Sequence, residues 1–162
     1  MSSNRKFPSR HVHTLKTHNG KPTSYSNQHL ASSTDSTILG PVNTVTFSSY
    51  PGTYVLTGST DRTIHLSRAL PSTDTQSIVE TTRPIQKYEA HGYSILDIAV
   101  SSDNSRFASV GGDRQVFLWD VEQGGTVRRW AGHSGRVEAV QFAGEGDSIV
   151  VSGRLSYTRF MN

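Results

Sequence analysis

A serine, a histidine and an aspartate, the residue types of a hydrolase triad, occur together in this chain as Ser109, His91 and Asp113. In such a triad an imidazole base, oriented by a carboxylate, activates the serine hydroxyl. The G-x-S-x-G turn that presents a nucleophilic serine in many hydrolases is absent from the sequence. Similar trios return in the neighbouring segments, and this repetition favours a structural role over the catalytic alternative.

The elements that carry these residues form a repeat. His91 and His133 are 42 residues apart, and each precedes an alternating apolar stretch, a polar turn and a second apolar stretch. An earlier copy runs from Val42 to Leu66 and includes the turn residues Asp61 and Arg62. A period of about 40–45 residues with short alternating strands is typical of one four-stranded propeller blade.

In the copy at 91–120, the sequence Gly111-Gly112-Asp113-Arg114 leads into a strand that ends in Trp119-Asp120. Its flanks are strands and the Walker lysine is absent, so we interpret it as a hairpin turn and not a phosphate-binding loop. A histidine, a serine or threonine, a turn aspartate and a Trp-Asp pair at these offsets resemble the WD40 repeat family.

The WD40 resemblance implies a buried hydrogen-bonded tetrad of His91, Ser109, Asp113 and Trp119. It also implies incomplete tetrads in the neighbouring copies. Their members are His18, Thr57 and Asp61 in the first copy and His133 and Ser152 in the third. Ser156 stands where an aspartate is expected, and Ser67-Arg68 replaces the Trp-Asp pair.

The amino-acid sequence of the repeats is also similar to one particular family of WD40 proteins. The segments 87–93, 111–121 and 127–133 are similar to the mitogen-activated protein kinase organizer (WD repeat-containing protein 83) family. This likeness implies a seven-bladed scaffold for kinase-module proteins that is also found with the spliceosome, in the cytoplasm and the nucleus. With 162 residues, the chain holds about three of the expected seven four-stranded blades, so the predicted fold is an all-β, partial WD40 β-propeller that is apparently truncated.

The repeat divides the chain into segments. A disordered basic N-terminus is expected at 1–10, and the later segments follow the copies of the repeat. They are an outer strand and the start of blade 1 (11–20), a disordered insertion (21–40), the rest of blade 1 (41–70), a loop (71–84), blade 2 (85–130), an incomplete blade 3 (131–153) and an aberrant tail (154–162).

The insertion at 21–40 has two interpretations. Its Ser- and Thr-rich composition buries too little apolar surface to fold. Gly20-Lys21, Leu39-Gly40 and Gly153-Arg154 can be encoded by codons that contain intron-boundary sequences, so a retained intron is one interpretation. A genuine surface loop is the other, because long loops cost little free energy.

The amino-acid composition excludes several kinds of binding site and catalysis. The chain has no cysteine, which excludes disulfides, cysteine-based zinc sites and thiol catalysis. It has 16 Lys and Arg against 13 Asp and Glu, with no long basic run, so direct nucleic-acid binding is not expected. His11 and His13 alternate on one side of a strand, but no third ligand is placed by spacing, so a surface pair is favoured over a metal site. No membrane span, cofactor, metal or small-molecule substrate is expected, and the chain is not expected to be an enzyme.

Tyr93, Arg114 and Arg136 lie at or beside predicted inter-strand turns. Propellers present such turns to other proteins, and tyrosine and arginine are residue types that often anchor interfaces. We therefore expect these three residues to contact protein partners, either kinase-module or spliceosomal proteins.

Overall fold

The computed structural model describes residues 41–69, 84–154 and 157–161. These residues form three antiparallel sheets with one short 3₁₀ turn, η1 (Glu145–Asp147), and no α-helix. The first sheet contains β1 (Val42–Phe47), β2 (Tyr54–Ser59), β3 (Thr63–Arg68) and β4 (Gln86–Glu89); the second contains β5 (Ile95–Val100), β6 (Arg106–Gly111), β7 (Gln115–Asp120) and β8 (Thr126–Ala131); the third contains β9 (Ala139–Ala143), β10 (Ile149–Arg154) and β11 (Tyr157–Met161).

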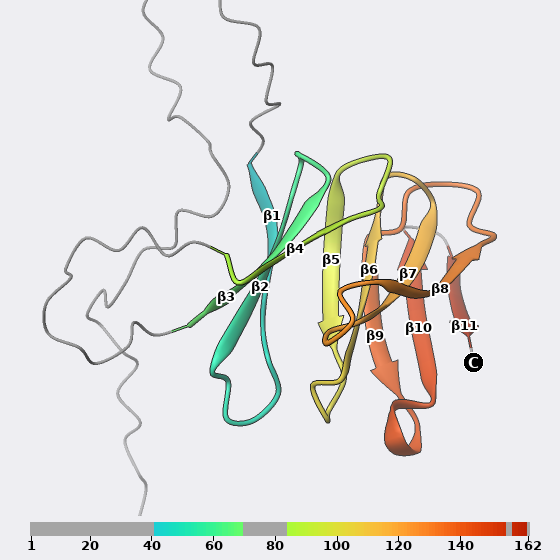
Figure 1. Ribbon diagram of the computed structural model, residues 1–162. Coiled ribbons are helices and arrows are strands. Elements are labelled where there is room, and N and C mark those ends of the chain that lie inside the picture. The colour runs from blue at the N-terminus through green and yellow to red at the C-terminus, as the bar shows by residue number, and fades with distance from the viewer. Residues whose placement is uncertain (1–40, 70–83, 155–156, 162) are drawn as a thin grey trace, which may run out of the picture.

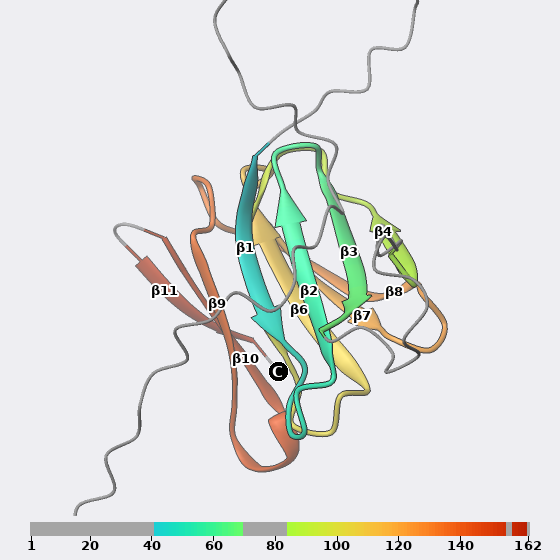
Figure 2. The same ribbon diagram turned by 90° about the vertical axis from the view of Figure 1, so that its left-hand side faces the viewer.

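The three sheets stand beside one another in chain order, as Figure 1 shows from left to right. Figure 2 looks onto the first sheet, with the second behind it. The first strands of the sheets, β1, β5 and β9, are neighbours. This arrangement confirms the predicted all-β partial propeller.

One predicted boundary was wrong. Segment 85–130 was expected to form blade 2, but β4 pairs with β3, so residues 86–89 complete the first sheet. Segment 154–162 is predicted to be an aberrant tail in sequence, and within it β11 pairs with β10. Backbone hydrogen bonds pair the two strands, and these bonds do not require the residue types of the repeat.

Several predicted segments lie wholly or mostly outside the residues that the structure describes. They are 1–10, 11–20, 21–40 and the loop at 71–84. No helix in the described part of the chain is both long enough and apolar enough to cross a membrane.

The apolar core fills the two spaces between adjacent sheets. Between the first and second sheets, buried members of both meet, including Ile64, Phe107 and Trp119. Between the second and third sheets the side chains are smaller, and Ala108, Val116, Val140 and Val150 meet there. A sheet buries both of its faces when another sheet packs against each of them. The second sheet is packed in this way, between the first and the third.

Polar side chains of the first strands tie adjacent sheets together. Asn43 Nδ2 donates to the Ile95 carbonyl oxygen at 2.8 Å, and Thr46 Oγ1 donates to the Ile98 carbonyl oxygen at 2.8 Å. On the other side of β5, Asp97 Oδ2 accepts from the Val140 amide at 2.9 Å. These bonds join β5 to the first strands of both neighbouring sheets.

The first and second sheets are in close contact at Gly58. A Cβ atom built there lies 2.6 Å from Ile95 Cγ2 and 2.8 Å from Thr44 Cγ2. A methyl group therefore does not fit without displacing buried neighbours.

Replacing Gly58 with alanine is expected to destabilise the protein by about 1–3 kcal/mol, because the new methyl overpacks this contact. Equilibrium urea unfolding measures the change. Gly125→Ala is the matched control, since a Cβ at Gly125 meets nothing within 4 Å. Equal stability of the two variants would contradict the close packing of the sheets.

Candidate functional site: a buried tetrad beneath an exposed rim

The second sheet brings His91, Ser109, Asp113 and Trp119 into one hydrogen-bonded chain. Trp119 Nε1 lies 2.8 Å from Ser109 Oγ, and Ser109 Oγ lies 2.7 Å from His91 Nε2. His91 Nδ1 lies 2.7 Å from Asp113 Oδ2. This series of hydrogen bonds joins β7, β6, the loop that precedes β5 and the β6–β7 turn. It therefore holds four parts of one sheet together.

The direction of the protons follows from the two ends of the chain. Trp119 Nε1 can only donate, and a carboxylate can only accept. Ser109 therefore accepts from the indole and donates its hydroxyl proton to His91 Nε2, while His91 Nδ1–H donates to Asp113. A neutral His91 with its proton on Nδ1 satisfies every bond, and this tautomer follows from the network.

The Asp113 carboxylate has further donors. The backbone amides of Gly92 and Gln115 lie 3.2 and 3.3 Å from its oxygens. Burial acts to raise the pKa of Asp113, but the hydrogen bond and electrostatic attraction of His91, together with the hydrogen bonds of the two amides, outweigh it. The pKa of Asp113 therefore lies below its ordinary value of 3.8.

Aromatic rings enclose the tetrad. The His91 ring lies 4.4 Å from the Phe117 ring, and the Trp119 ring stacks on Phe107 with centroids 5.7 Å apart. Tyr88 of the first sheet meets Phe107 edge-to-face at 4.8 Å. These contacts exclude water from the hydrogen bonds and join the tetrad to the neighbouring sheet.

The environment of Ser109 does not suit a hydrolase. Ser109 is fully buried at 0 % exposure, and its oxygen already accepts a bond from Trp119. A nucleophile must reach a substrate carbonyl, and this oxygen has no path to one. The trio therefore has a structural role in this conformation.

The incomplete tetrads differ from sheet to sheet. In the third sheet, Ser152 Oγ lies 2.8 Å from His133 Nε2. In the first sheet, Thr57 is buried on β2, and Asp61 Oδ1 accepts from the amide and hydroxyl of Thr63 at 2.9 and 2.7 Å, within the β2–β3 turn. His18, like the pair His11 and His13, lies outside the described residues.

The third sheet lacks a tryptophan at the position of Trp119. In the second sheet Phe107 pairs with Trp119, and in the third the corresponding pair is Val150 and Met161. Two cavities of about 380 and 360 Å³ lie beside this pair, and Trp130 and Met161 line both. Both cavities therefore lie where the third sheet has Val150 and Met161 in place of Phe107 and Trp119.

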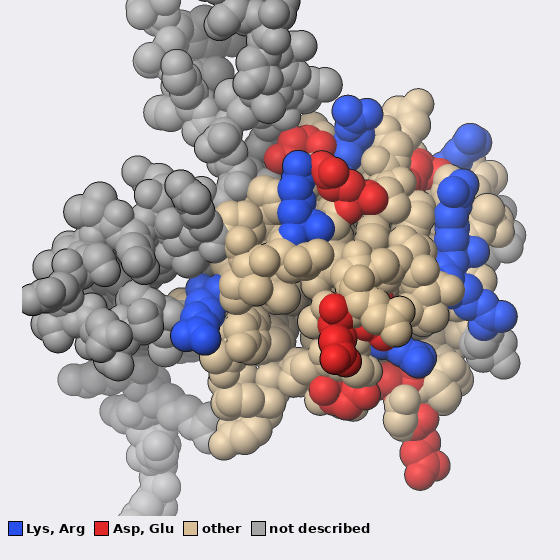
Figure 3. Space-filling view, in the orientation of Figure 1, with Lys and Arg blue, Asp and Glu red and all other residues tan. Residues whose placement is uncertain are grey.

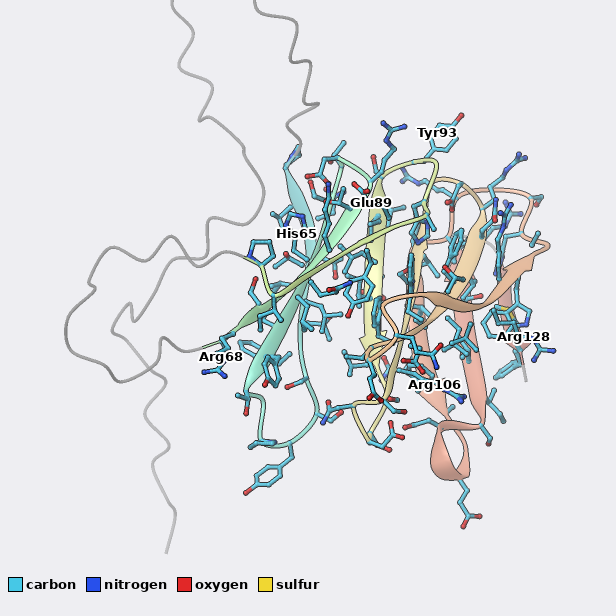
Figure 4. All side chains as sticks on the ribbon, viewed as in Figure 1. His65, Arg68, Glu89, Tyr93, Arg106 and Arg128 are labelled. Atoms are coloured by element: carbon cyan, nitrogen blue, oxygen red, sulfur yellow. The ribbon has the colours of Figure 1, made fainter. Side chains whose placement is uncertain are left out.

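The three predicted partner-binding residues lie along one rim. Tyr93 is 65 % exposed on the loop between β4 and β5, where Figure 4 shows it pointing away from the sheets. Arg114 is exposed in the β6–β7 turn. Arg136 is exposed between β8 and β9, and its Nε donates to Glu138 Oε1 at 2.7 Å.

Two features of the described residues bear on other site types. No group of three or more His, Asp or Glu side chains in the described segments is placed to hold a metal ion.

The inter-sheet role of Asp97 was not predicted from the sequence. A carboxylate inside the apolar run Ile95-Leu96-Asp97-Ile98 is the signal that could have revealed it.

Replacing Ser109 with alanine is expected to destabilise the protein by about 2–4 kcal/mol, because buried groups of Trp119 and His91 both lose a partner. Urea unfolding measures the loss. Ser105→Ala is the control, since the Ser105 hydroxyl bonds Asp103 at the exposed surface. A loss for Ser109→Ala no larger than for Ser105→Ala would contradict the structural role of the tetrad.

The lowered pKa of Asp113 makes its contribution to stability dependent on pH. The contribution is fully present well above the unfolded-state pKa of about 3.9 and is lost as the pH falls through the lower folded-state value. The free energy of unfolding of the wild type should therefore exceed that of Asp113→Asn at pH 7, and the gap should shrink below about pH 4. Denaturant melts from pH 7 to pH 3 test this, and a gap independent of pH would refute it.

Comparison with known proteins agrees with this geometry. The model of the family described as WD domain, G-beta repeat, matches residues 39–66 and 82–120. WD40 repeat proteins are generally non-enzymatic scaffolds.

Several known proteins are similar to a large part of this chain. WD repeat domain-containing protein 83 homolog of Dictyostelium discoideum is 30 % identical over 120 residues, which are 68 % of this chain and 33 % of that protein. DDB1- and CUL4-associated factor 5 of Homo sapiens is 32 % identical over 117 residues, 70 % of this chain and 12 % of that protein. Protein HIR1 of Kluyveromyces lactis is 34 % identical over 117 residues, 68 % of this chain and 13 % of that protein.

The chain thus spans a third or less of the length of these three relatives. The repeat spacing, the stacked antiparallel sheets, the tetrad and the family match lead to one conclusion: this chain contains WD40 repeats and has the fold of a partial β-propeller.

Proposed function

We propose that this chain is a non-enzymatic scaffold that binds other proteins through its loop rim and takes part in organising a mitogen-activated protein kinase module. The proposal rests on one observation: some polar groups of the second sheet are buried and bonded to one another, and others are exposed at its loops. The tetrad uses its polar atoms on one another inside the sheet, whereas Tyr93 and Arg114 project from the same loops into solvent.

A rigid base beneath exposed loops suits protein recognition. The tetrad fixes the β6–β7 turn and the loop that carries Tyr93, since Asp113 bonds both His91 and the Gly92 amide. Loops held in one conformation lose little entropy on binding, and exposed tyrosine and arginine supply contact area and directed hydrogen bonds. The rim is therefore already ordered for a partner.

The kinase-module assignment rests on the likeness of residues 87–93, 111–121 and 127–133 to the WD repeat-containing protein 83 family and on the Dictyostelium relative. The same likeness supports a second candidate, a structural role with the spliceosome. Both roles place the protein in the cytoplasm and the nucleus, and their partners differ.

Affinity capture with the tagged chain, followed by mass spectrometry, separates the two candidates. Enrichment of kinases of the module is expected, whereas enrichment of small nuclear ribonucleoproteins would favour the spliceosomal role. Tyr93→Ala is expected to reduce capture at least about tenfold, because truncating an interface anchor removes 1.4 kcal/mol or more of binding free energy.

Tyr50→Ala is the matched control for this experiment, since Tyr50 is 96 % exposed on the β1–β2 turn at the opposite end of the sheets. Capture should survive this change. Equal loss in both variants, or recovery of no specific protein by the wild type, would contradict a scaffold that binds through the rim.

A further inference from the structure

Two adjacent sheets present an arginine at the same place. The β2–β3 turn carries Asp61-Arg62 and the β6–β7 turn carries Asp113-Arg114. Both arginines are exposed and adopt the left-handed backbone conformation, with φ of 72° and 65°. From this pair we infer that the rim binds an acidic, extended segment of a partner protein; the inference rests on the proposed function and names the chemistry of its partner.

The acidic groups near this rim are already engaged. The Asp113 side chain is only 6 % exposed and bonds His91, while Asp61 bonds Thr63 in its own turn. Glu89 pairs with Lys87 at 2.5 Å.

Farther along the rim, Glu138 pairs with Arg136 at 2.7 Å. Figure 3 shows charged side chains of both signs near the upper edge of this face. Neither Arg62 nor Arg114 forms an ion pair with a carboxylate of the described residues.

Tyr93 lies beside the second of these turns. A Cβ atom built at Gly112 lies 3.1 Å from Tyr93 Cβ, so the tyrosine stands next to the turn that carries Arg114. The first turn is tied to the same region, because Asn43 Nδ2 bonds both Thr60 Oγ1 at 3.3 Å and the Ile95 carbonyl oxygen at 2.8 Å. The two arginines and the tyrosine therefore belong to one connected surface.

The spacing of the turns suits an extended peptide. Packed sheets lie about 10 Å apart, which is the span of roughly three residues of extended chain at about 3.3 Å each. Two carboxylates about three residues apart can each form a bidentate pair with a guanidinium. An apolar or aromatic side chain between them would then cover Tyr93.

Nucleic acid fits this surface less well. Single strands are held by successive bases stacked on several aromatic side chains along a basic groove. On the described part of this rim Tyr93 is the one exposed aromatic residue, and the basic groups are few. An acidic peptide needs no more than the two guanidinium groups and one aromatic contact.

Fluorescence anisotropy with a labelled hexaglutamate peptide at low salt tests the inference on the intact chain. Arg62→Glu with Arg114→Glu is expected to weaken binding at least about tenfold, because two charge-assisted contacts become repulsive. Arg62→Lys with Arg114→Lys should keep more of the affinity than the glutamate pair, since it preserves the charge and loses only the bidentate geometry.

Arg68→Glu with Arg106→Glu is the matched control. It makes the same change in net charge at exposed arginines that Figure 4 shows away from the rim. Affinity for this variant should fall by less than about threefold, as for residues remote from the contact. Thermal transitions of all variants should match the wild type, because each of these side chains is exposed.

Three results would overturn the inference: an equal loss in the control, no binding of hexaglutamate by the wild type, or tighter binding of an RNA hexamer than of the peptide. A further comparison separates its failure from failure of the scaffold role. The Arg62→Glu, Arg114→Glu variant can capture the same proteins as the wild type while Tyr93→Ala does not. In that case the proposed scaffold function is kept, and the inference that the rim binds an acidic segment is rejected.

Discussion

The hydrogen-bond chain from Trp119 through Ser109 and His91 to Asp113 is the constraint on which the second sheet depends. A buried indole N–H, hydroxyl and imidazole each need a partner, and an unsatisfied group costs about 1–3 kcal/mol. Here every group finds one within 2.8 Å, and the carboxylate at the end also bonds two backbone amides. The requirement that these polar atoms meet fixes the β6–β7 turn and the loop before β5 in one arrangement.

The neighbouring sheets are arranged around this one. The second sheet packs large aromatic and branched side chains against the first and small ones against the third. Asp97 and the carbonyl oxygens of β5 receive bonds from both sides, so β5 is joined to β1 and β9. This use of polar groups inside the stack leaves none of the tetrad for catalysis, and it holds the exposed loops in place above a rigid base.

The sequence predicted what the repeat encodes. The strands and the turns at Asp61 and Asp113 follow from residue types at fixed offsets. The grouping of His91, Ser109 and Trp119 follows from the resemblance to the WD40 repeat. It failed where tertiary pairing decides: residues 86–89 lead in sequence toward His91, yet they pair with β3. The strand at 157–161 was not predicted from the residue types of the repeat, because its pairing with β10 depends on backbone hydrogen bonds that any such residues can form. Contacts between sheets, such as that of Asp97 with Val140, depend on the stacking and have no fixed offset.

The exchange of the two indole protons tests the tetrad most directly. The chain has two tryptophans, so Trp119 and Trp130 give two side-chain N–H signals in a nitrogen-15 spectrum. Trp119 is 2 % exposed and donates to Ser109, whereas Trp130 is partly exposed and lines two cavities. The account predicts that the Trp119 proton exchanges with deuterium only on the timescale of global unfolding, while the Trp130 proton exchanges much faster. Rapid exchange of both would contradict a closed tetrad at the centre of the fold.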